Sequence, residues 1–311
     1  MQNSTLPMCS GRISPKRSSI GRWQPIRIAP GGLEVFELAK RIVVSIVFVP
    51  ILLFVMLCLP PIAWTAVVCF ISMVAAFELM RATGGGNITA LMQGAAILSA
   101  GIIPLSCCYG YGQHATAVCG FVVMAVSFGC AIHAYDEGDV SLGFSHVLMT
   151  LFAGVMIPLG LSALVVLKCR EYGEYLVLLA VLLAFATDAG AYFAGVFLGR
   201  HRGITRVSPN KSLEGYIGGF VCGTVFAIGY GMAASAISHA SVSYLSMALC
   251  GLLGAGATEL GDLSFSFIKR QYGVKDYGDL IPGHGGMLDR FDSMIFCAPV
   301  VLFLLWCLPA F

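Results

Sequence analysis

The sequence predicts an all-α, polytopic integral membrane protein with about nine transmembrane helices and a cytoplasmic N-terminus. Three observations lead to this fold class. Of the 311 residues, 58% are hydrophobic and only 11% are charged, with a mean hydropathy of +0.87. Successive apolar segments are long enough to cross about 30 Å of hydrocarbon. The alternation that a membrane β-barrel needs, in segments of roughly ten residues, is absent from them.

The chain begins with a polar, basic stretch, residues 1–33, which we interpret as a tail on the membrane surface. It is not typical of a cleaved signal peptide, because the first apolar run begins only at about Ile42. Pro60 and Pro61 end the first span. We divide the rest into a five-span region, 34–170, and a four-span catalytic region, 171–311. The candidate spans are residues 42–59, 62–80, 88–106, 113–134, 144–167, 174–198, 214–238, 241–268 and 292–310.

The distribution of basic residues predicts the orientation. With the N-terminus in the cytoplasm, 16 of the 18 Lys and Arg residues lie on the cytoplasmic side, and only Lys168 and Arg170 lie outside. The net charge of +2 is too small to imply a nucleic-acid partner. The 12 cysteines are scattered through apolar runs, so we interpret them as small buried hydrophobic residues rather than disulfides or zinc ligands.

The segment from Glu259 to Asp292 concentrates the charge of the chain: six carboxylates, four Lys or Arg residues, one His and a Gly-rich turn. Helical spacing places Glu259 and Asp262 on one face with Ser266. Asp289 and Asp292 share a face of the next helix if that helix begins near residue 288. Acids at two helix ends suit a hard divalent cation. The basic residues suit a polyphosphate; they are Lys269, Arg270, Lys275 and Arg290.

A solvated loop that follows the positive-inside bias is the alternative interpretation of these charges. Acids placed within helices favour a functional site, because ionisable groups at membrane depth are costly.

The same segment resembles the signature of the bacterial phosphatidate cytidylyltransferase family. The matching elements are Ser266-x-Ile268-Lys269-Arg270, Lys275-Asp276-x-Gly278 and Ile281-Pro282-x-His284-Gly285-Gly286-Met287-x-Asp289-Arg290-Phe291-Asp292. More than a dozen fixed positions over 27 residues make this pattern far more specific than a lone Gly-rich motif.

A further buried charge, Asp188, lies in the sixth span about ten residues before its end, which at 1.5 Å per residue is about 15 Å deep. Small residues on its face, Gly195 and Gly199, allow another helix to approach closely. A protonated Asp188 in an interhelical hydrogen bond is one interpretation; we expect instead that it faces the same polar cavity as Asp262. Asp188-x-x-Ala191-Tyr192-x-x-Gly195 is similar to a second pattern of this family.

The loop after this span contains Ser208-Pro209-Asn210-Lys211-Ser212-x-Glu214-Gly215, which resembles the family's Ser-Pro-Lys-Lys-Thr-x-Glu-Gly element. Asn210 replaces the first Lys, so Lys211 is the expected phosphate contact. We expect Ser208 or Ser212 to cap the next helix, with Glu214 in its first turn. A helix N-terminus beside Lys211 is also an anion site.

The resemblance implies a nucleotidyltransferase that converts CTP and phosphatidate into CDP-diacylglycerol and pyrophosphate, at the cytoplasmic face of a cell membrane. It implies Mg²⁺ held by Asp262 and Asp289, with Asp188 and Asp292 as further ligands or their neighbours, and it favours a second cation and a homodimer. We assign phosphate contacts to Lys269, Arg270, Lys275 and Arg290, and phosphate orientation or proton transfer to His284. The expected substrate-binding residues are Ser208, Lys211, Ser212, Glu214, Ser266, Gly285 and Gly286.

Other functions stay open at this point. A CTP-dependent lipid kinase, or a cytidylyltransferase for another lipid, would use similar residues. An ion-coupled transporter would also bury carboxylates near Gly-broken helices, but it predicts paired motifs in two halves of the chain, and the sequence shows no such repeat. The membrane of a eukaryotic organelle is the alternative location.

Overall fold

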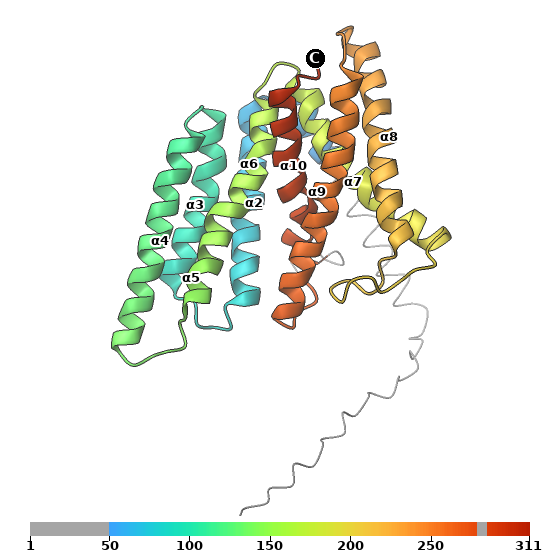
Figure 1. The fold of residues 1–311 in the computed structure, drawn as a ribbon. Helices are drawn as coiled ribbons and strands as arrows, with labels where there is room; N and C mark the ends of the chain where they lie inside the picture. The colour runs from blue at the N-terminus through green and yellow to red at the C-terminus, as the bar shows by residue number, and fades with distance from the viewer. Residues whose placement is uncertain (1–49, 279–284) are drawn as a thin grey trace, which may run out of the picture.

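The computed structural model describes residues 50–278 and 285–311, and in these ranges the chain is a bundle of long helices without a strand (Figure 1). The predicted all-α fold is confirmed. Residues 50–58, the described part of the first predicted span, are helical. The helices that follow are α2 (Pro61–Thr83), α3 (Ala90–Cys108), α4 (Gly112–Asp136), α5 (Phe144–Leu151), the π-helical turn η1 (Phe152–Met156), α6 (Ile157–Lys168), α7 (Gly173–Phe197), α8 (Leu213–Ser238), α9 (Tyr244–Gln271) and α10 (Leu288–Cys307).

Seven helical segments of the described chain are long and apolar enough to cross a membrane, with Phe144–Lys168 counted as one. The remaining long helix, α9, is the one that carries Glu259, Asp262 and Lys269. The predicted spans agree with the helices to within a few residues at most ends. The predicted orientation, with the N-terminus in the cytoplasm, stays a prediction.

The segment Phe144–Lys168 is interrupted at its middle by η1, whose wider turn frees backbone groups from the regular α-helical pattern. One of these groups finds a partner on α3, where Ser99 Oγ donates to Gly154 O at 2.7 Å. The helices approach closely here, since a Cβ on Gly154 would lie 2.9 Å from Ala96 Cα. Irregular backbone at membrane depth is therefore buried in protein, as it must be where water is absent.

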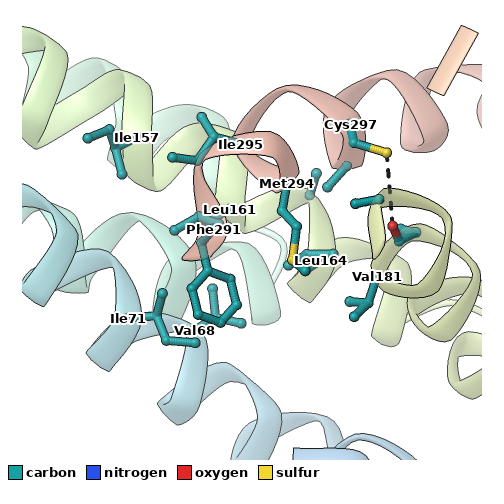
Figure 2. Close-up of a cluster of buried hydrophobic side chains, with 14 of the residues drawn as sticks. Val68, Ile71, Ile157, Leu161, Leu164, Val181, Phe291, Met294, Ile295 and Cys297 are labelled. Carbon is teal, nitrogen blue, oxygen red and sulfur yellow. Dashed lines mark hydrogen bonds between the residues drawn. The ribbon is translucent and has the colours of Figure 1, made fainter. Parts of the chain in front are cut away.

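Helix α10 connects the two halves of the protein. It packs against α2 and α6 on one side and against α7 and α9 on the other. Figure 2 shows Phe291, Met294 and Ile295 of α10 among side chains of α2, α6 and α7. These contacts stabilise the bundle through van der Waals packing. The hydrophobic effect contributes little free energy here, because lipid tails are as apolar as the core. The labelled neighbours are Val68, Ile71, Ile157, Leu161, Leu164 and Val181.

Helices α7 and α8 pack through glycines that leave no room for side chains. A Cβ on Gly218 would lie 2.1 Å from Ala194 Cβ, and one on Gly190 would lie 2.3 Å from Cys222 Cβ. This tight contact is on a different face of α7 from the one predicted. On the predicted face, a Cβ on Gly195 would lie 3.8 Å from Gly215 Cα of α8, which is an ordinary contact distance. The 11 cysteines of the described chain are all free. Cys119, Cys250 and Cys297 are buried as predicted, whereas the other eight are half-buried or exposed.

The polar groups gather at one end of the bundle. Helices α2, α7 and α9 end there, and α8 and α10 begin there. Residues 199–212 connect α7 to α8 at the lower edge of Figure 1. We call this the polar end. It contains the described acids and lysines that the sequence assigns to a site.

Candidate functional site

The segment 199–212 is fastened to the start of α8, which fixes the position of Lys211. Ser212 is the N-cap, and its Oγ accepts a hydrogen bond from Gly215 N at 3.1 Å, so one of the two predicted caps is confirmed. Arg202 and Ser212 form an isolated antiparallel bridge. Glu214, in the first turn as predicted, accepts from His201 N and lies 2.6 Å from His201 Nδ1.

Lys211 reaches two acids of α9. Its Nζ lies 2.7 Å from Asp262 Oδ2 and 2.7 Å from Glu259 Oε2. Burial disfavours a charged lysine, but the two carboxylates outweigh it and raise the pKa of Lys211 above its usual range. Lys211 is therefore a fixed positive charge at the polar end.

Glu259 is the more deeply buried of the two acids, with a side chain 5% exposed. Its Oε2 is occupied by Lys211, whereas its Oε1 has no hydrogen-bond partner among the described residues. A Cβ on Gly219 of α8 would lie 2.8 Å from this Oε1, so only glycine leaves room for the acid. An unpaired buried oxygen is costly, and such groups are commonly found at functional sites.

A cavity of about 390 Å³ opens beside this ion pair. Asp188 of α7, Asp262 of α9 and Lys211 all line it, so the structure brings together the two acids that were predicted to share a polar cavity. Arg202 and Tyr216 add a second cation and an aromatic ring to the wall. Lys211 Nζ lies 5.3 Å from the centre of the Tyr216 ring. The cavity thus offers both acidic and basic groups to one ligand.

Helix α10 contributes a third acid to the same region. Ser293 Oγ donates to Asp188 Oδ2 at 3.4 Å and lies 3.4 Å from Asp292 Oδ1. Asp188 in turn lines the cavity together with Asp262. Acids from α7, α9 and α10 therefore converge.

Asp289, one turn earlier on α10, lies in a different set of contacts. Its Oδ1 pairs with Lys269 Nζ at 2.9 Å. Its Oδ2 accepts from Tyr277 N at 2.9 Å and from Gly286 N at 3.1 Å. Tyr277 in turn donates its hydroxyl to Phe265 O at 2.8 Å. Asp289 thus joins Tyr277 and Gly286 to Lys269 of α9.

A buried acid of α2 lies at the same end of the bundle. Glu78 Oε1 accepts from Met287 N at 3.0 Å, and its Oε2 accepts from Leu288 N at 2.8 Å. The side chain is therefore bound to the first backbone N–H groups of α10. Glu78 was not among the predicted site residues.

The donor set at the convergence of acids suits a divalent cation in kind, because Asp188, Asp262 and Asp292 offer only carboxylate oxygens, which Mg²⁺ prefers. As the side chains stand, no three acidic, His or Cys residues of the described chain are gathered closely enough to hold an ion. Lys211 neutralises Asp262 in this arrangement. Holding a cation would require Asp262 to release Lys211 and the carboxylates to turn toward one another.

Comparison with known proteins places the chain in a family. The family model described as "Cytidylyltransferase family" matches residues 39–308, which is most of the sequence. The chain belongs to the cytidylyltransferase family. This agrees with the resemblance seen in the signature segment.

Curated relatives are more specific in name. A protein of Bacillus subtilis is 40% identical over 135 residues, 43% of this chain and 49% of the relative. A protein of Staphylococcus haemolyticus is 39% identical over 136 residues, 44% of this chain and 51% of the relative. One of Staphylococcus saprophyticus is 34% identical over 146 residues, 47% of this chain and 55% of the relative. All three are named phosphatidate cytidylyltransferase, and the chain spans about half the length of the curated relatives it matches.

With the family established, the predicted site residues divide into three groups. Asp188, Lys211 and Asp262 line the cavity with the cap Ser212, and Asp292 is linked to Asp188 through Ser293. Lys269, Asp289 and Gly286 form the second set of contacts. Gly285 adopts a φ of +81°, which a glycine tolerates best. Arg270, Lys275 and Arg290 are exposed, Ser208 and Ser266 are half-buried, and His284 lies outside the described residues.

Sequence reasoning missed four contributors: Glu78, Arg202, Tyr216 and Ser293. Glu259 had been placed on the face of Asp262 but was given no role. A lone acid near the end of an apolar helix, such as Glu78, was the signal that could have been used.

Proposed function

We propose that this protein is a phosphatidate cytidylyltransferase, which transfers the cytidylyl group of CTP to phosphatidate and releases pyrophosphate. The observation that carries the proposal is the Lys211–Asp262 pair beside a cavity that also holds Asp188, at the polar end of a membrane bundle. The names of the curated relatives support the same reaction. A site at helix ends suits a reaction between a water-soluble nucleotide and a lipid.

In this reaction an oxygen of the lipid phosphate attacks the α-phosphorus of CTP. A new P–O bond forms there, the bond from the α-phosphorus to the bridging oxygen of the β-phosphate breaks, and pyrophosphate leaves. No protein nucleophile is needed, so the protein contributes positioning and charge. Lys211 and Arg202 are placed at the cavity wall to contact phosphate oxygens. Lys269 is held by Asp289 at the same end of the bundle, and we assign it a further phosphate contact.

We assign Mg²⁺ to Asp188, Asp262 and Asp292, and Asp289 stays a predicted ligand. When bound, Mg²⁺ supplies charge neutralisation on the reacting phosphates. Lys211 balances the charges of Asp262 and Glu259, and at the cavity wall its ammonium group would contact a phosphate of the nucleotide.

For the lipid we propose that an acyl chain lies in an apolar groove of about 460 Å³ between α6 and α10. Ile295 and Phe296 line this groove, and they follow Asp292 and Ser293 directly on α10. The lipid head group would therefore lie at the acids while its chain follows the same helix away from the polar end. Leu159, Phe303 and Trp306 continue the apolar lining.

The deciding experiment gives purified protein CTP labelled in the base and, in parallel, at the γ-phosphate, together with phosphatidate in detergent micelles. Formation of CDP-lipid with release of labelled pyrophosphate supports the transferase. CDP release with label on the lipid indicates a lipid kinase, and unchanged CTP favours transport. Diacylglycerol and other phospholipids in place of phosphatidate test the lipid specificity. Asp262→Asn is the matched inactive control.

We further propose that the polar end faces the cytoplasm, where CTP is available, and that the protein forms a homodimer. Single cysteines introduced at exposed Lys275 and at Glu171, near opposite ends of the bundle, test the orientation by their reaction with an impermeant thiol reagent. Reaction of the 171 position alone in intact cells supports the proposed orientation, and reaction of the 275 position alone contradicts it. The mass of the detergent-solubilised protein tests the dimer.

A further inference from the structure

Glu78 stands apart from the other acids because it belongs to the half of the chain to which the sequence assigns no chemistry. It lies on α2, five residues before the helix ends at Thr83 and three before the basic Arg81. The residue is 4% exposed. Within the described ranges it forms no ion pair, so its charge is balanced by backbone dipoles rather than by a side-chain cation. A buried acid in a membrane helix is costly and is rarely kept without a function.

The partners of Glu78 are the first backbone N–H groups of α10. Such groups have no acceptor inside their own helix, and the helix dipole makes that end attractive to a negative charge. The carboxylate accepts from Met287 N at 3.0 Å and from Leu288 N at 2.8 Å, and so it caps α10 from a helix more than 200 residues away in sequence. The residue at the N-cap position itself, Met287, offers no side-chain cap.

Two glycines show how closely the preceding segment covers this acid. A Cβ on Gly278 would lie 2.6 Å from Glu78 Oε1, and one on Gly286 would lie 2.7 Å from Glu78 Oε2. The three atoms nearest to a Cβ on Gly278 all belong to Glu78. A Cβ on Gly286 would also meet the backbone nitrogen of Gly278 at 2.8 Å. Residues 278 and 286 can therefore lie this close to Glu78 only while both positions lack a side chain.

The capped helix carries the acids of the site. Asp289 is the second residue of α10, and Asp292 follows one turn later beside Ser293 and Asp188. A rotation or shift of the first turn of α10 would move both acids relative to α7 and α9. Glu78 fixes that turn from one side, and Asp289, through Tyr277 and Gly286, fixes the segment before it from the other.

We propose that Glu78 is a positioning residue for the reaction: by capping α10 from α2, it sets where Asp289 and Asp292 stand relative to Asp188 and Asp262. This inference rests on the proposed function for its kinetic consequence, while its structural part can be tested alone. It gives the otherwise apolar N-terminal helices a direct part in building the site.

Glu78→Gln is the first test, because it keeps the shape of the side chain but presents an NH₂ group to one of two N–H donors. We expect activity to fall by about 100-fold, the loss that a misplacement of about 1 Å produces. We also expect the Mg²⁺ concentration for half-maximal activity to rise, since the acids are displaced. Hydrogen–deuterium exchange should speed up in residues 285–292 but not in α8. Glu171→Gln, which removes an exposed carboxylate at the opposite end of the bundle, should leave all three readouts unchanged.

A merely structural role gives a different result. Less protein would then fold, but the folded fraction would show the wild-type Mg²⁺ dependence and wild-type exchange at the start of α10, which would overturn the proposal. If wild-type protein forms no CDP-lipid, the proposed function fails instead, and the exchange of residues 285–292 still decides whether Glu78 holds α10.

Gly278→Ala tests the same contact from the other side and serves where Glu78 variants accumulate poorly. Alone, it should lower activity and raise exchange at the start of α10, because the new methyl group displaces Glu78. In a Glu78→Ala background the obstacle is gone, so Gly278→Ala should add little further loss. Strictly additive effects in this double-mutant cycle would contradict direct contact between the two positions.

Discussion

The ammonium group of Lys211 lies 2.7 Å from Asp262 Oδ2, so the segment before α8 is tied directly to the middle of α9's polar face. Glu259 takes a second position on the same ammonium group at 2.7 Å. One positive charge is thus shared by two acids at the wall of the cavity. This pairing gives the protein a balanced charge at the point where we propose that it binds a cation and a triphosphate.

Replacing Lys211 by Met should remove most of the activity and destabilise the protein. Breaking a buried pair by deleting one partner costs about 3–5 kcal/mol, because the remaining charge loses its compensation; partial exposure of Lys211 lowers this figure. Steady-state rates and thermal unfolding in detergent measure the two effects. Arg81→Met removes an exposed cation at the same end of the bundle and should be nearly silent. Full activity of Lys211→Met would show that the lysine contacts no substrate.

The stability lost in Lys211→Met should be partly restored by Glu259→Gln. This second change removes the acid that is left buried without a cation, while its amide keeps the shape of the side chain. Unfolding temperatures of the two single variants and the double variant measure the coupling. A double variant that is as unstable as the sum of the singles would indicate that the 2.7 Å contact contributes no net coupling.

Asp188→Asn and Asp262→Asn should each abolish detectable CDP-lipid formation while the protein still accumulates in the membrane. The amide keeps the size of the side chain but removes the negative charge that a Mg²⁺ ligand needs. Activity of the wild type should vanish with EDTA and return when Mg²⁺ is added in excess. Near-normal turnover in either variant would remove that residue from the metal site.

Deprotonation of Lys211 should not lower the activity as the pH rises toward about 9. The adjacent carboxylates raise its pKa despite burial. A raised lysine pKa contributes stability that is complete below about 10.4, the value in unfolded chains, and is lost only as pH rises through the higher folded pKa. Wild type and Lys211→Arg should therefore have parallel pH–rate profiles up to about pH 9. A decline in that range that is seen in wild type and absent from Lys211→Arg would contradict this assignment.

Ser212→Ala should weaken the start of α8 and raise the KM for CTP more than it lowers kcat. Loss of an N-cap hydroxyl costs about 0.5–2 kcal/mol, and here it also loosens the residue next to Lys211. Ser264→Ala, which removes a hydroxyl bonded only within α9, is the matched control. Equal effects of the two variants on the KM for CTP would show that the Ser212 cap does not contribute to nucleotide binding.

The helices and the cap of α8 could be predicted from sequence, because apolar length and capping residues act locally. The convergence of Asp188 with Asp262 was expected from the family patterns and from the cost of burying a charge, not from spacing alone. Nothing local predicted that Ser293 would join Asp188 to Asp292, since that contact depends on how α10 packs between α7 and α9. The η1 turn was also missed. The hydroxyl that donates to the backbone carbonyl of its Gly154 belongs to Ser99, which is far away in the sequence.

Glu78 shows the same limit most clearly. In sequence it is one acid near the end of an apolar helix, which is equally typical of a side chain that extends to the membrane surface. Its hydrogen bonds to Met287 and Leu288 join residues that are 209 and 210 positions apart, and they become visible only in the folded chain.

The glycines between α7 and α8 have a consequence for how this site can change over time. At Gly190 and Gly218 the facing helix is so close that no side chain would fit. The distance between α7 and α8 therefore depends on both positions being glycine. An added methyl group at either position would increase the distance between α7 and α8. Asp188 and Lys211 would then move relative to each other, although neither glycine touches a substrate. Drift at these uncharged positions should therefore be restrained as strongly as drift at the acids themselves.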